Sequence, residues 1–283
     1  MQHGLELPNM CPGGNVQVLV QLACLAEEAG WDGVFLEDYI IHHAATDAPT
    51  FDPWVVLTAI ALRTERVRLG TTITPLSRRR PWKLAREAVT LDHLSNGRLI
   101  LGVGIGDRGD PGFAQVGEIT DAKQRARMLD EALDVLVGLW SGQPFSYRGE
   151  HYQVRDVTFL PRPMQQPRIP IWVGGSWPHK GPVQRAARWD GIVPYKDTHG
   201  RGWQDMTPDD VQALKAEISS QRSASFEIML GGRRRGMDWE QERALIRSLA
   251  EAGATWWGEY IEPDDLEDLQ GCIERVKQGP LRA

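Results

Sequence analysis

The chain has 283 residues, of which 41% are hydrophobic and 25% are charged, and this is the composition of a globular protein with a sizeable core. Its 32 Lys and Arg residues against 38 Asp and Glu residues give a net charge of −6, which repels polyanions and excludes a general nucleic-acid-binding protein. The 3 cysteines form no CxxC pair, so we expect a reducing compartment and neither a disulfide framework nor a zinc knuckle.

The first residues lack the basic and apolar regions of a signal peptide, and no stretch approaches about 18 unbroken apolar residues. We therefore expect a cytoplasmic protein that does not enter a membrane. No composition shift or internal repeat marks a boundary, so residues 1–283 are expected to form a single domain.

Short apolar runs alternate with longer amphipathic ones along the chain, which is typical of βα units and a parallel sheet. The predicted strands, in chain order, are Gly4–Pro8, Gly33–Asp38, Val67–Thr74, Arg98–Asp107, Ile169–Gly175, Gly191–Tyr195, Phe226–Gly231 and Thr255–Ile261. Capping residues, prolines and glycines place helices between them. The predicted helices include Val16–Ala29, Trp54–Thr64 after Asp52-Pro53, one that ends at Asn96-Gly97, Gln124–Trp140, Gly181–Trp189, Val211–Ser220 after Thr207-Pro208, and Asp264–Lys277.

Eight strand and helix units in a chain of 283 residues predict an α/β fold, a (β/α)₈ TIM barrel. An open doubly wound sheet is the alternative. The spacing is uneven between the fourth and fifth strands, where the irregular stretch Gly142–Gln166 is predicted to be an insertion or a lid.

In a barrel of this kind the active site lies at the carboxyl ends of the strands. The residues predicted there are Asn9, Glu37, Asp38, Thr71 to Thr74, Gly104 to Asp107, Gly174 to Trp177, Lys196, Arg233 to Arg235 and Glu259.

Two glycine-rich segments stand at these strand ends. Gly102-Val-Gly104-Ile-Gly106 lacks the spacing of a dinucleotide-binding loop, and its glycines serve either close backbone packing or the approach of a planar ligand. Gly174-Gly175-Ser176-Trp177 directly precedes a predicted helix and has the character of a phosphate cradle, with a tight turn as the alternative.

Other side chains that carry chemistry are few. The runs Arg78–Arg80 and Arg233–Arg235 could bind an anion or be solvated, and Trp172, Trp177, Trp256 and Trp257 could pack in the core or wall a flat ligand. No metal-binding spacing and no GxSxG elbow is present, so no metal is expected and a cofactor is expected to carry the reaction.

The chain resembles the bacterial luciferase-like, flavin-dependent oxidoreductases. The resemblance rests on segments that follow one another over most of the chain: Gly4-Leu-Glu-Leu-Pro8-Asn9, Ala26-Glu-Glu-Ala-Gly30-Trp31-Asp32-Gly33, Arg68-Leu-Gly70-Thr-Thr-Ile-Thr74-Pro75, Thr90-Leu-Asp92-His-Leu-Ser95-Asn-Gly97-Arg98-Leu-Ile-Leu-Gly102-Val-Gly104, and Ile169-Pro-Ile-Trp-Val-Gly174-Gly175-Ser176.

The resemblance implies a (β/α)₈ barrel that binds FMN or, alternatively, the deazaflavin coenzyme F420 at the carboxyl ends of its strands. It places Thr71, Thr72 and Ile73 under the ring at a bulge of the third strand, Gly174, Gly175 and Ser176 at the phosphate, and Asn9 and Gly106 along the ring pocket. Trp177 is also expected to bind the cofactor. Asp38 matches an acidic residue of the family. Many relatives have a histidine next, where this chain has Tyr39. Tyr39 or one of the nearby histidines, His42 or His43, is therefore expected to share the proton transfer with Asp38, and the alternative is an exposed histidine pair without a role.

The resulting hypothesis is a flavin-dependent monooxygenase that acts on a small organic substrate with reduced flavin and O₂. NAD(P)H or a flavin reductase is the possible source of the electrons that reduce the flavin. An F420-dependent dehydrogenase or reductase that transfers hydride is the alternative. Two further alternatives are a non-catalytic flavin-binding protein and a barrel aldolase or isomerase that uses Lys196. The resemblance also implies a homodimer or larger homo-oligomer.

Overall fold

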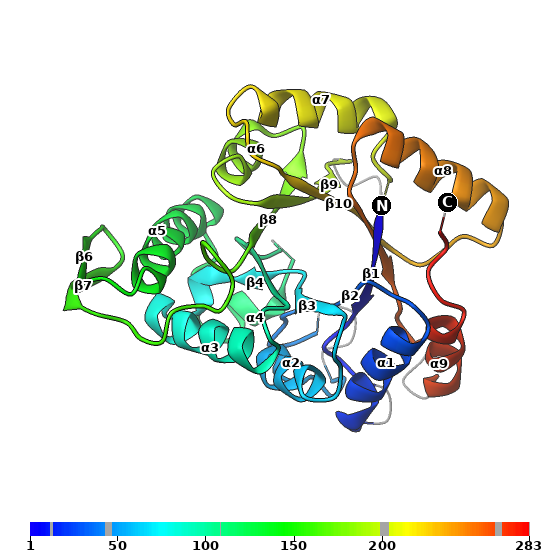
Figure 1. Ribbon diagram of the computed structural model, residues 1–283, viewed down its shortest axis with the longest axis horizontal. Helices are drawn as coiled ribbons and strands as arrows, with labels where there is room; N and C mark the ends of the chain where they lie inside the picture. The colour runs from blue at the N-terminus through cyan, green and yellow to red at the C-terminus, as the bar shows by residue number, and fades with distance from the viewer. Residues whose placement is uncertain (12–13, 43–46, 108, 199–203, 264–267, 283) are drawn as a thin grey trace.

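A parallel sheet closes on itself at the centre of the molecule, and helices surround it (Figure 1). The computed structural model describes residues 1–11, 14–42, 47–107, 109–198, 204–263 and 268–282. Within these residues the sheet order is β3-β2-β1-β11-β10-β9-β8-β5-β4, and a pairing between β3 and β5 closes the barrel. This confirms the predicted (β/α)₈ barrel and excludes the open sheet.

All the predicted strands are present with shifted ends. The barrel strands are β1 (Gln2–Leu7), β2 (Gly33–Leu36), β3 (Arg68–Thr71) continued by β4 (Thr74–Pro75), β5 (Leu99–Gly104), β8 (Ile171–Trp177), β9 (Gly191–Lys196), β10 (Glu227–Arg233) and β11 (Trp256–Tyr260).

The helices lie outside the barrel, where their apolar sides cover the outward-facing side chains of the strands (Figure 1). They are α1 (Gln17–Glu28), α2 (Pro53–Ala61), α3 (Pro81–Leu94), α5 (Ala122–Trp140), α6 (Lys180–Ala186), α7 (Pro208–Ser219), α8 (Trp239–Ala252) and α9 (Leu269–Lys277), with the short η2 (Leu76–Arg78) and α4 (Pro111–Ala114) in the loops after β4 and β5. Residues 264–267 of the last predicted helix lie outside the described residues. No helix in the described part of the chain has the length and apolar character needed to span a bilayer.

The helix starts follow the capping chemistry expected from the sequence. The Asp52 carboxylate accepts hydrogen bonds from the backbone N–H groups of Trp54 and Val55, 2.9 and 3.1 Å away, at the start of α2. Thr207 forms a capping box with Asp210 at the start of α7, because each side chain accepts from the backbone N–H of the other.

An aromatic and aliphatic layer fills the inside of the barrel. Phe35 packs against Trp172 and Trp256 with ring centroids 5.8 Å apart in both pairs, and Trp172 and Trp256 lie 5.4 Å apart. Ile100 and Met229 complete this buried cluster. Trp172 and Trp256 therefore pack in the core.

The third barrel strand is interrupted at Thr72 and Ile73, which are joined by a cis peptide bond. Gly70 pairs with Ile100 before the interruption, and Thr74 pairs with Val103 after it. Between these two pairs the third strand advances by four residues while β5 advances by three. This extra residue is the bulge that the resemblance implies at this point.

The insertion between the fourth and fifth predicted strands forms an antiparallel hairpin of β6 (Phe145–Arg148) and β7 (Gln153–Val157). Its turn is held by the Glu131 carboxylate of α5, which accepts hydrogen bonds from three successive backbone N–H groups at 2.9 to 3.1 Å, those of Glu150, His151 and Tyr152. Tyr152 also packs edge-on against Trp82 of α3. The expectation of a lid is therefore wrong: the hairpin lies beside α5 on the outside of the barrel (Figure 1).

Candidate functional site

The upper end of the barrel interior is polar, directly above the aromatic layer. Gly4 of β1 faces Phe35 and Met229 of that layer, and Glu6, two residues later on the same strand, faces the same interior one layer higher. A Cβ atom on Gly258 of β11 would overlap with the Glu6 carboxyl group. The missing side chain at Gly258 thus makes room for Glu6 inside the barrel.

Glu6 belongs to a group of polar side chains at the carboxyl ends of three neighbouring strands. Glu37 follows β2, and its Oε2 atom accepts hydrogen bonds from the Tyr260 hydroxyl at 3.0 Å and from His42 Nε2 at 3.3 Å. Burial, and secondly the nearby Glu37, raises the pKa of Glu6 to about 8. Burial also raises the pKa of Tyr260, so this phenol remains protonated and acts as a donor.

His42 and Tyr39, two of the predicted catalytic residues, lie beside this acidic group. Their rings are 5.5 Å apart, and the His42 side chain is buried. Burial, with Glu37 as the next cause, raises the pKa of Tyr39 above its usual value. The structure thus brings Tyr39 and His42 together with Glu37. The sequence analysis had placed Glu37 at the carboxyl ends of the strands.

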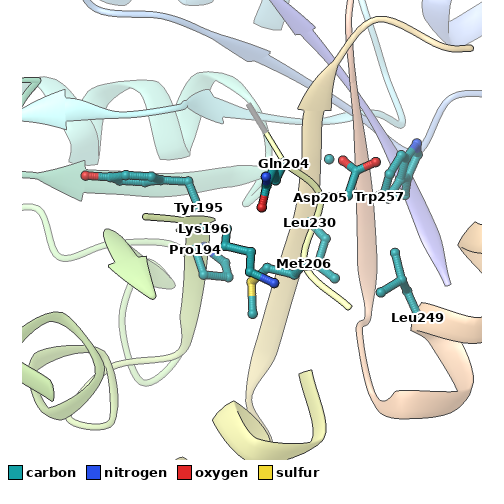
Figure 2. Close-up of a pocket in the computed structure, with 10 residues that line it drawn as sticks. Pro194, Tyr195, Lys196, Gln204, Asp205, Met206, Leu230, Leu249 and Trp257 are labelled. Carbon is teal, nitrogen blue, oxygen red and sulfur yellow. The ribbon is translucent and has the colours of Figure 1, made fainter. Parts of the chain in front are cut away.

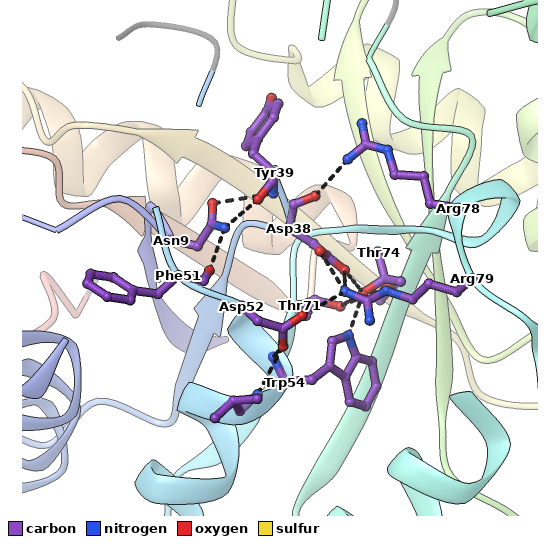
Figure 3. Close-up of polar contacts among 12 residues, drawn as sticks. Asn9, Asp38, Tyr39, Phe51, Asp52, Trp54, Thr71, Thr74, Arg78 and Arg79 are labelled. Atoms are coloured by element: carbon purple, nitrogen blue, oxygen red, sulfur yellow. Dashed lines mark hydrogen bonds and ion pairs between the residues drawn. The ribbon is translucent and has the colours of Figure 1, made fainter. Parts of the chain in front are cut away.

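Asp38, the third predicted catalytic residue, points away from this group. Its carboxylate accepts a hydrogen bond from the Thr74 hydroxyl at 2.7 Å and contacts Arg79 Nη2 through both oxygens, at 2.8 and 2.9 Å (Figure 3). Thr74 in turn accepts from Trp54 Nε1 and contacts the Thr71 hydroxyl. Asp38 is therefore the centre of a buried ionic network.

Asn9 uses its side-chain amide to hold backbone in place. It donates to the carbonyls of Tyr39 and Phe51 at 2.7 and 2.8 Å, and its oxygen accepts from the Tyr39 N–H at 3.3 Å (Figure 3). Because Asn9 is fully buried, these bonds fix the loop that carries Tyr39 and His42.

A groove with a volume of about 330 Å³ adjoins this loop. It is lined by Asp38, Tyr39, Ile40, Thr50, Phe51, Asp52, Pro53, Arg78 and Arg79. Arg78 forms an ion pair with the buried Asp110 and lies over the ring of Phe113 at 3.8 Å, so this lining side chain is held in place from two sides. The groove is large enough for part of an organic ligand.

The glycines of β5 allow close packing against the bulge. A Cβ atom on Gly102 would meet the Thr71 carbonyl, and one on Gly104 would overlap with the Ile73 side chain. Gly106 has a φ of +79° and packs against Phe113. These glycines thus serve close packing, and the approach of a planar ligand to Gly106 stays a prediction.

The end of β8 continues further than the turn expected there. The strand extends through Gly174, Gly175 and Ser176 to Trp177, and all four residues pair with β9. The pairing with β5 stops at Val173, so in the described residues the other edge of this segment is open. Trp177 is largely buried and donates from Nε1 to Asp210 at 3.0 Å, so its indole packs at the start of α7.

The basic side chains at the strand ends are held by carboxylates. Lys196 binds Asp210, Arg233 binds Asp205 and Glu242, and Arg235 binds the buried Glu259. Burial alone would raise the pKa of Asp210, but hydrogen bonds from Lys196, Thr207 and Trp177 outweigh it and lower the pKa to about 2. Arg233 and Arg235 are thus held in ion pairs, whereas Arg80 of the other predicted run is exposed.

A second, much smaller cavity lies between β9, β10 and the segment before α7 (Figure 2). Its volume is about 10 Å³, which is room for one water molecule, and Lys196, Met206 and Trp257 are among its lining residues. It is too small for an organic substrate, so the groove beside Asp38 and Tyr39 is the better candidate for a ligand.

The sequence analysis missed Glu6 and Tyr260. One signal was present: Glu6 interrupts the apolar run of a predicted strand at a position two residues after Gly4, and therefore on the inner face. Tyr260 carries no comparable signal, because a tyrosine near the end of a strand is usual.

A closed parallel barrel with its polar groups and groove at the carboxyl ends of the strands defines the TIM-barrel class. Comparison with known families narrows this class. Residues 6–234 match the model of the luciferase-like monooxygenases. The chain belongs to this family, as the sequence motifs indicated.

Two curated relatives carry the same name. The chain is 37% identical over 169 residues to the F420-dependent glucose-6-phosphate dehydrogenase of Microbacterium testaceum, a match that covers 56% of this chain and 47% of that protein. It is also 37% identical over 263 residues to the protein of that name from Beutenbergia cavernae, covering 90% of this chain and 73% of the relative. The match to the first of these spans about half the length of the relative.

Among solved structures, the monooxygenase RslO1 from Streptomyces bottropensis superposes with a TM-score of 0.77 at 21% identity, covering 99% of both chains. At this identity the likeness shows the shared fold.

Proposed function

We propose that this protein is an F420-dependent oxidoreductase, a dehydrogenase or reductase that transfers hydride between the deazaflavin and a small organic substrate. The observation that carries the proposal is the 37% identity with an F420-dependent dehydrogenase over 90% of the chain. Both relatives described above are named for F420. The names thus favour F420 over FMN, and a dehydrogenase over the monooxygenase that the sequence motifs suggested first.

The residues at the barrel mouth fit such a group. The Thr72 hydroxyl at the bulge is buried beside the Glu6 carboxyl group, at the polar end of the barrel interior. The open edge of β8 at Gly174 to Trp177 offers backbone groups to the same space. We propose that Thr71, Thr72 and Ile73 support the ring and that Gly174, Gly175 and Ser176 lie near the phosphate-bearing tail.

When bound, F420 would supply a two-electron hydride acceptor or donor. The side chains of this protein would bind and orient the reactants and transfer protons. Tyr39 and His42, held in place by Asn9 and hydrogen-bonded or packed beside Glu37, are the proposed proton-handling groups. Asp38 is proposed to position the groove through Arg79 and Thr74.

A sugar phosphate needs a cation for its phosphate group. The two arginines that line the groove, Arg78 and Arg79, each already pair with a carboxylate. We therefore propose a small organic substrate with an alcohol or carbonyl group.

The test is a pair of titrations of the purified protein, with F420 and with FMN, followed by ligand absorbance and by fluorescence of the 11 tryptophans. We expect saturable binding of F420 at concentrations at least tenfold below those needed for FMN. Tight binding of FMN with none of F420 would overturn the proposal and restore the monooxygenase hypothesis. Binding of neither would leave the barrel aldolase or isomerase as the better hypothesis.

A further inference from the structure

The groove beside Asp38 has an apolar part that is already in place in the ligand-free protein. Tyr39, Ile40, Phe51 and Pro53 line this part, and Ile40 is 50% exposed. The buried Asn9 amide donates hydrogen bonds to the carbonyls of both Tyr39 and Phe51, at 2.7 and 2.8 Å, so the two segments are fixed relative to each other. A half-exposed aliphatic side chain between aromatic residues suits the apolar body of an organic ligand.

The charged part of the lining is centred on Arg79, which is shared by two carboxylates. Arg79 Nη2 contacts both carboxylate oxygens of Asp38, at 2.8 and 2.9 Å, and lies 3.6 Å from Asp52 Oδ2 (Figure 3). The other lining arginine, Arg78, is paired with the buried Asp110. One positive charge at Arg79 therefore faces two negative charges, and Asp52 is the carboxylate in excess.

Asp52 is held in this position by the start of α2. Its Oδ1 atom accepts hydrogen bonds from the backbone N–H groups of Trp54 and Val55, at 2.9 and 3.1 Å, while Oδ2 is the atom nearest to Arg79. The exposed N–H groups of a helix N-terminus favour an anion. Here Asp52 binds those N–H groups itself and adds a negative charge, so this helix start does not attract an anion to the groove.

Arg79 nevertheless retains hydrogen-bonding capacity. Within the described residues its guanidinium group contacts carboxylates through Nη2 alone, and a guanidinium group has five N–H donors. A carbonyl or hydroxyl oxygen can accept a hydrogen bond from such a donor without bringing a charge. A carboxylate or phosphate group would meet the negative charges of Asp38 and Asp52 at the same place.

We propose that Asp52 is a specificity-determining residue of the groove, because its charge excludes anionic ligands. The groove then takes an uncharged molecule with an apolar body and a carbonyl or hydroxyl oxygen, to which Arg79 donates a hydrogen bond. The inference rests on the proposed function only where it identifies this molecule with the substrate of hydride transfer. The selection by charge is a property of the protein without F420.

The experiment measures binding by NMR of protein labelled with ¹³C in the isoleucine δ1-methyl groups. Ile40 is the reporter because it lines the groove, and its signal is assigned by its loss in Ile40→Val. The probes are acetophenone and benzoate, which share an aromatic ring and differ in charge. At about pH 7.5 and low salt, we expect acetophenone to shift the Ile40 signal and benzoate to bind about tenfold more weakly or less.

The decisive variant is Asp52→Asn, which removes the charge and keeps an oxygen atom that can cap α2. We expect its affinity for benzoate to rise about threefold or more, and its affinity for acetophenone to stay within about twofold of the wild type. The matched control is Asp238→Asn. Asp238 caps α8 in the same way, through the N–H groups of Glu240 and Gln241 at 3.0 Å, and is not among the residues that line the groove. It should bind both probes like the wild type.

Arg79→Lys tests the donor. Lysine keeps the positive charge beside Asp38 but lacks the planar set of N–H groups, so we expect acetophenone to bind several-fold more weakly. An unchanged affinity for acetophenone would show that Arg79 does not bind the ligand oxygen.

Equal affinities of the wild type for benzoate and acetophenone, or the same preference in Asp52→Asn as in the wild type, would overturn the role of Asp52. If neither probe shifts the Ile40 signal, the groove is not the binding site of such a molecule and the inference is wrong. The proposed function fails separately, through the absence of F420 binding, and these titrations contain no F420.

Discussion

The Ile73 side chain occupies the place where a side chain on Gly104 would begin, so the bulge of the third strand and the end of β5 are fitted to each other. Gly104→Ala must therefore displace Ile73 or β5. We expect a loss of about 1 to 3 kcal/mol in the free energy of unfolding, measured by urea denaturation, and weaker binding of F420 by fluorescence titration. Gly181→Ala in α6 is the matched control, because a Cβ atom there meets nothing within 4 Å. If Gly104→Ala is as stable as this control, the close packing of Ile73 against Gly104 is wrong.

The Asp38 carboxylate is bound by Arg79 and Thr74, so we expect Asp38 to contribute mainly to the stability of the fold. Asp38→Asn removes the charge and turns an amide N–H₂ toward one of these donors, and we expect a loss of about 2 to 4 kcal/mol in unfolding free energy. In the exposed Lys83–Glu87 pair, Glu87→Gln should cost less than about 0.5 kcal/mol. If Asp38→Asn keeps full stability but loses turnover, the catalytic role expected from the sequence is the correct one.

His3 is expected to make the protein sensitive to acid. Burial, and secondly the charge of Arg282, lowers the pKa of His3 to about 4, against 6.5 in the unfolded chain. Between these values the unfolded chain binds the proton that the folded protein excludes, so the contribution of His3 to stability is full above pH 6.5 and is lost as the pH decreases toward 4.

His3→Gln should make this acid limb shallower in urea midpoints measured from about pH 7 to 4. Glu6 acts with the opposite sign between pH 4.5 and 8, so the two effects partly cancel below pH 6.5. An acid limb as steep in His3→Gln as in the wild type would show that His3 is not its source.

The Glu131 carboxylate holds the turn of the β6–β7 hairpin from the outside of the barrel. Glu131→Ala should release that turn at a cost of about 1 to 3 kcal/mol and speed proteolysis between β6 and β7. Glu131→Gln keeps one acceptor oxygen, so its stability and its rate of proteolysis should lie between those of the wild type and Glu131→Ala. F420 binding should be unchanged in both variants, whereas a large loss of affinity would mean that the hairpin reaches the site after all.

The fold could be predicted because its signals are local. Alternating apolar runs, the Asp52 and Thr207 caps and the Asn96-Gly97 stop are read from neighbouring residues, and each predicted element is present within a few residues. The hairpin is the exception. Its position depends on Glu131, which precedes the turn by about 20 residues and whose contact with it no local pattern reveals.

The same distinction separates the candidate site residues. From the sequence alone one could place Asp38, Tyr39, Thr72 and Gly174 at the carboxyl ends of strands, since the order of strands determines which end each residue occupies.

Only the tertiary structure decided what those residues do there. It directed Asp38 toward Arg79, packed Gly104 against Ile73, and brought Glu6, Glu37 and Tyr260 together although β1 and β11 lie at opposite ends of the chain. The reason is physical: hydrogen-bond partners and protonation depend on distances and burial that barrel closure creates, whereas the strands themselves follow from the local alternation of side chains.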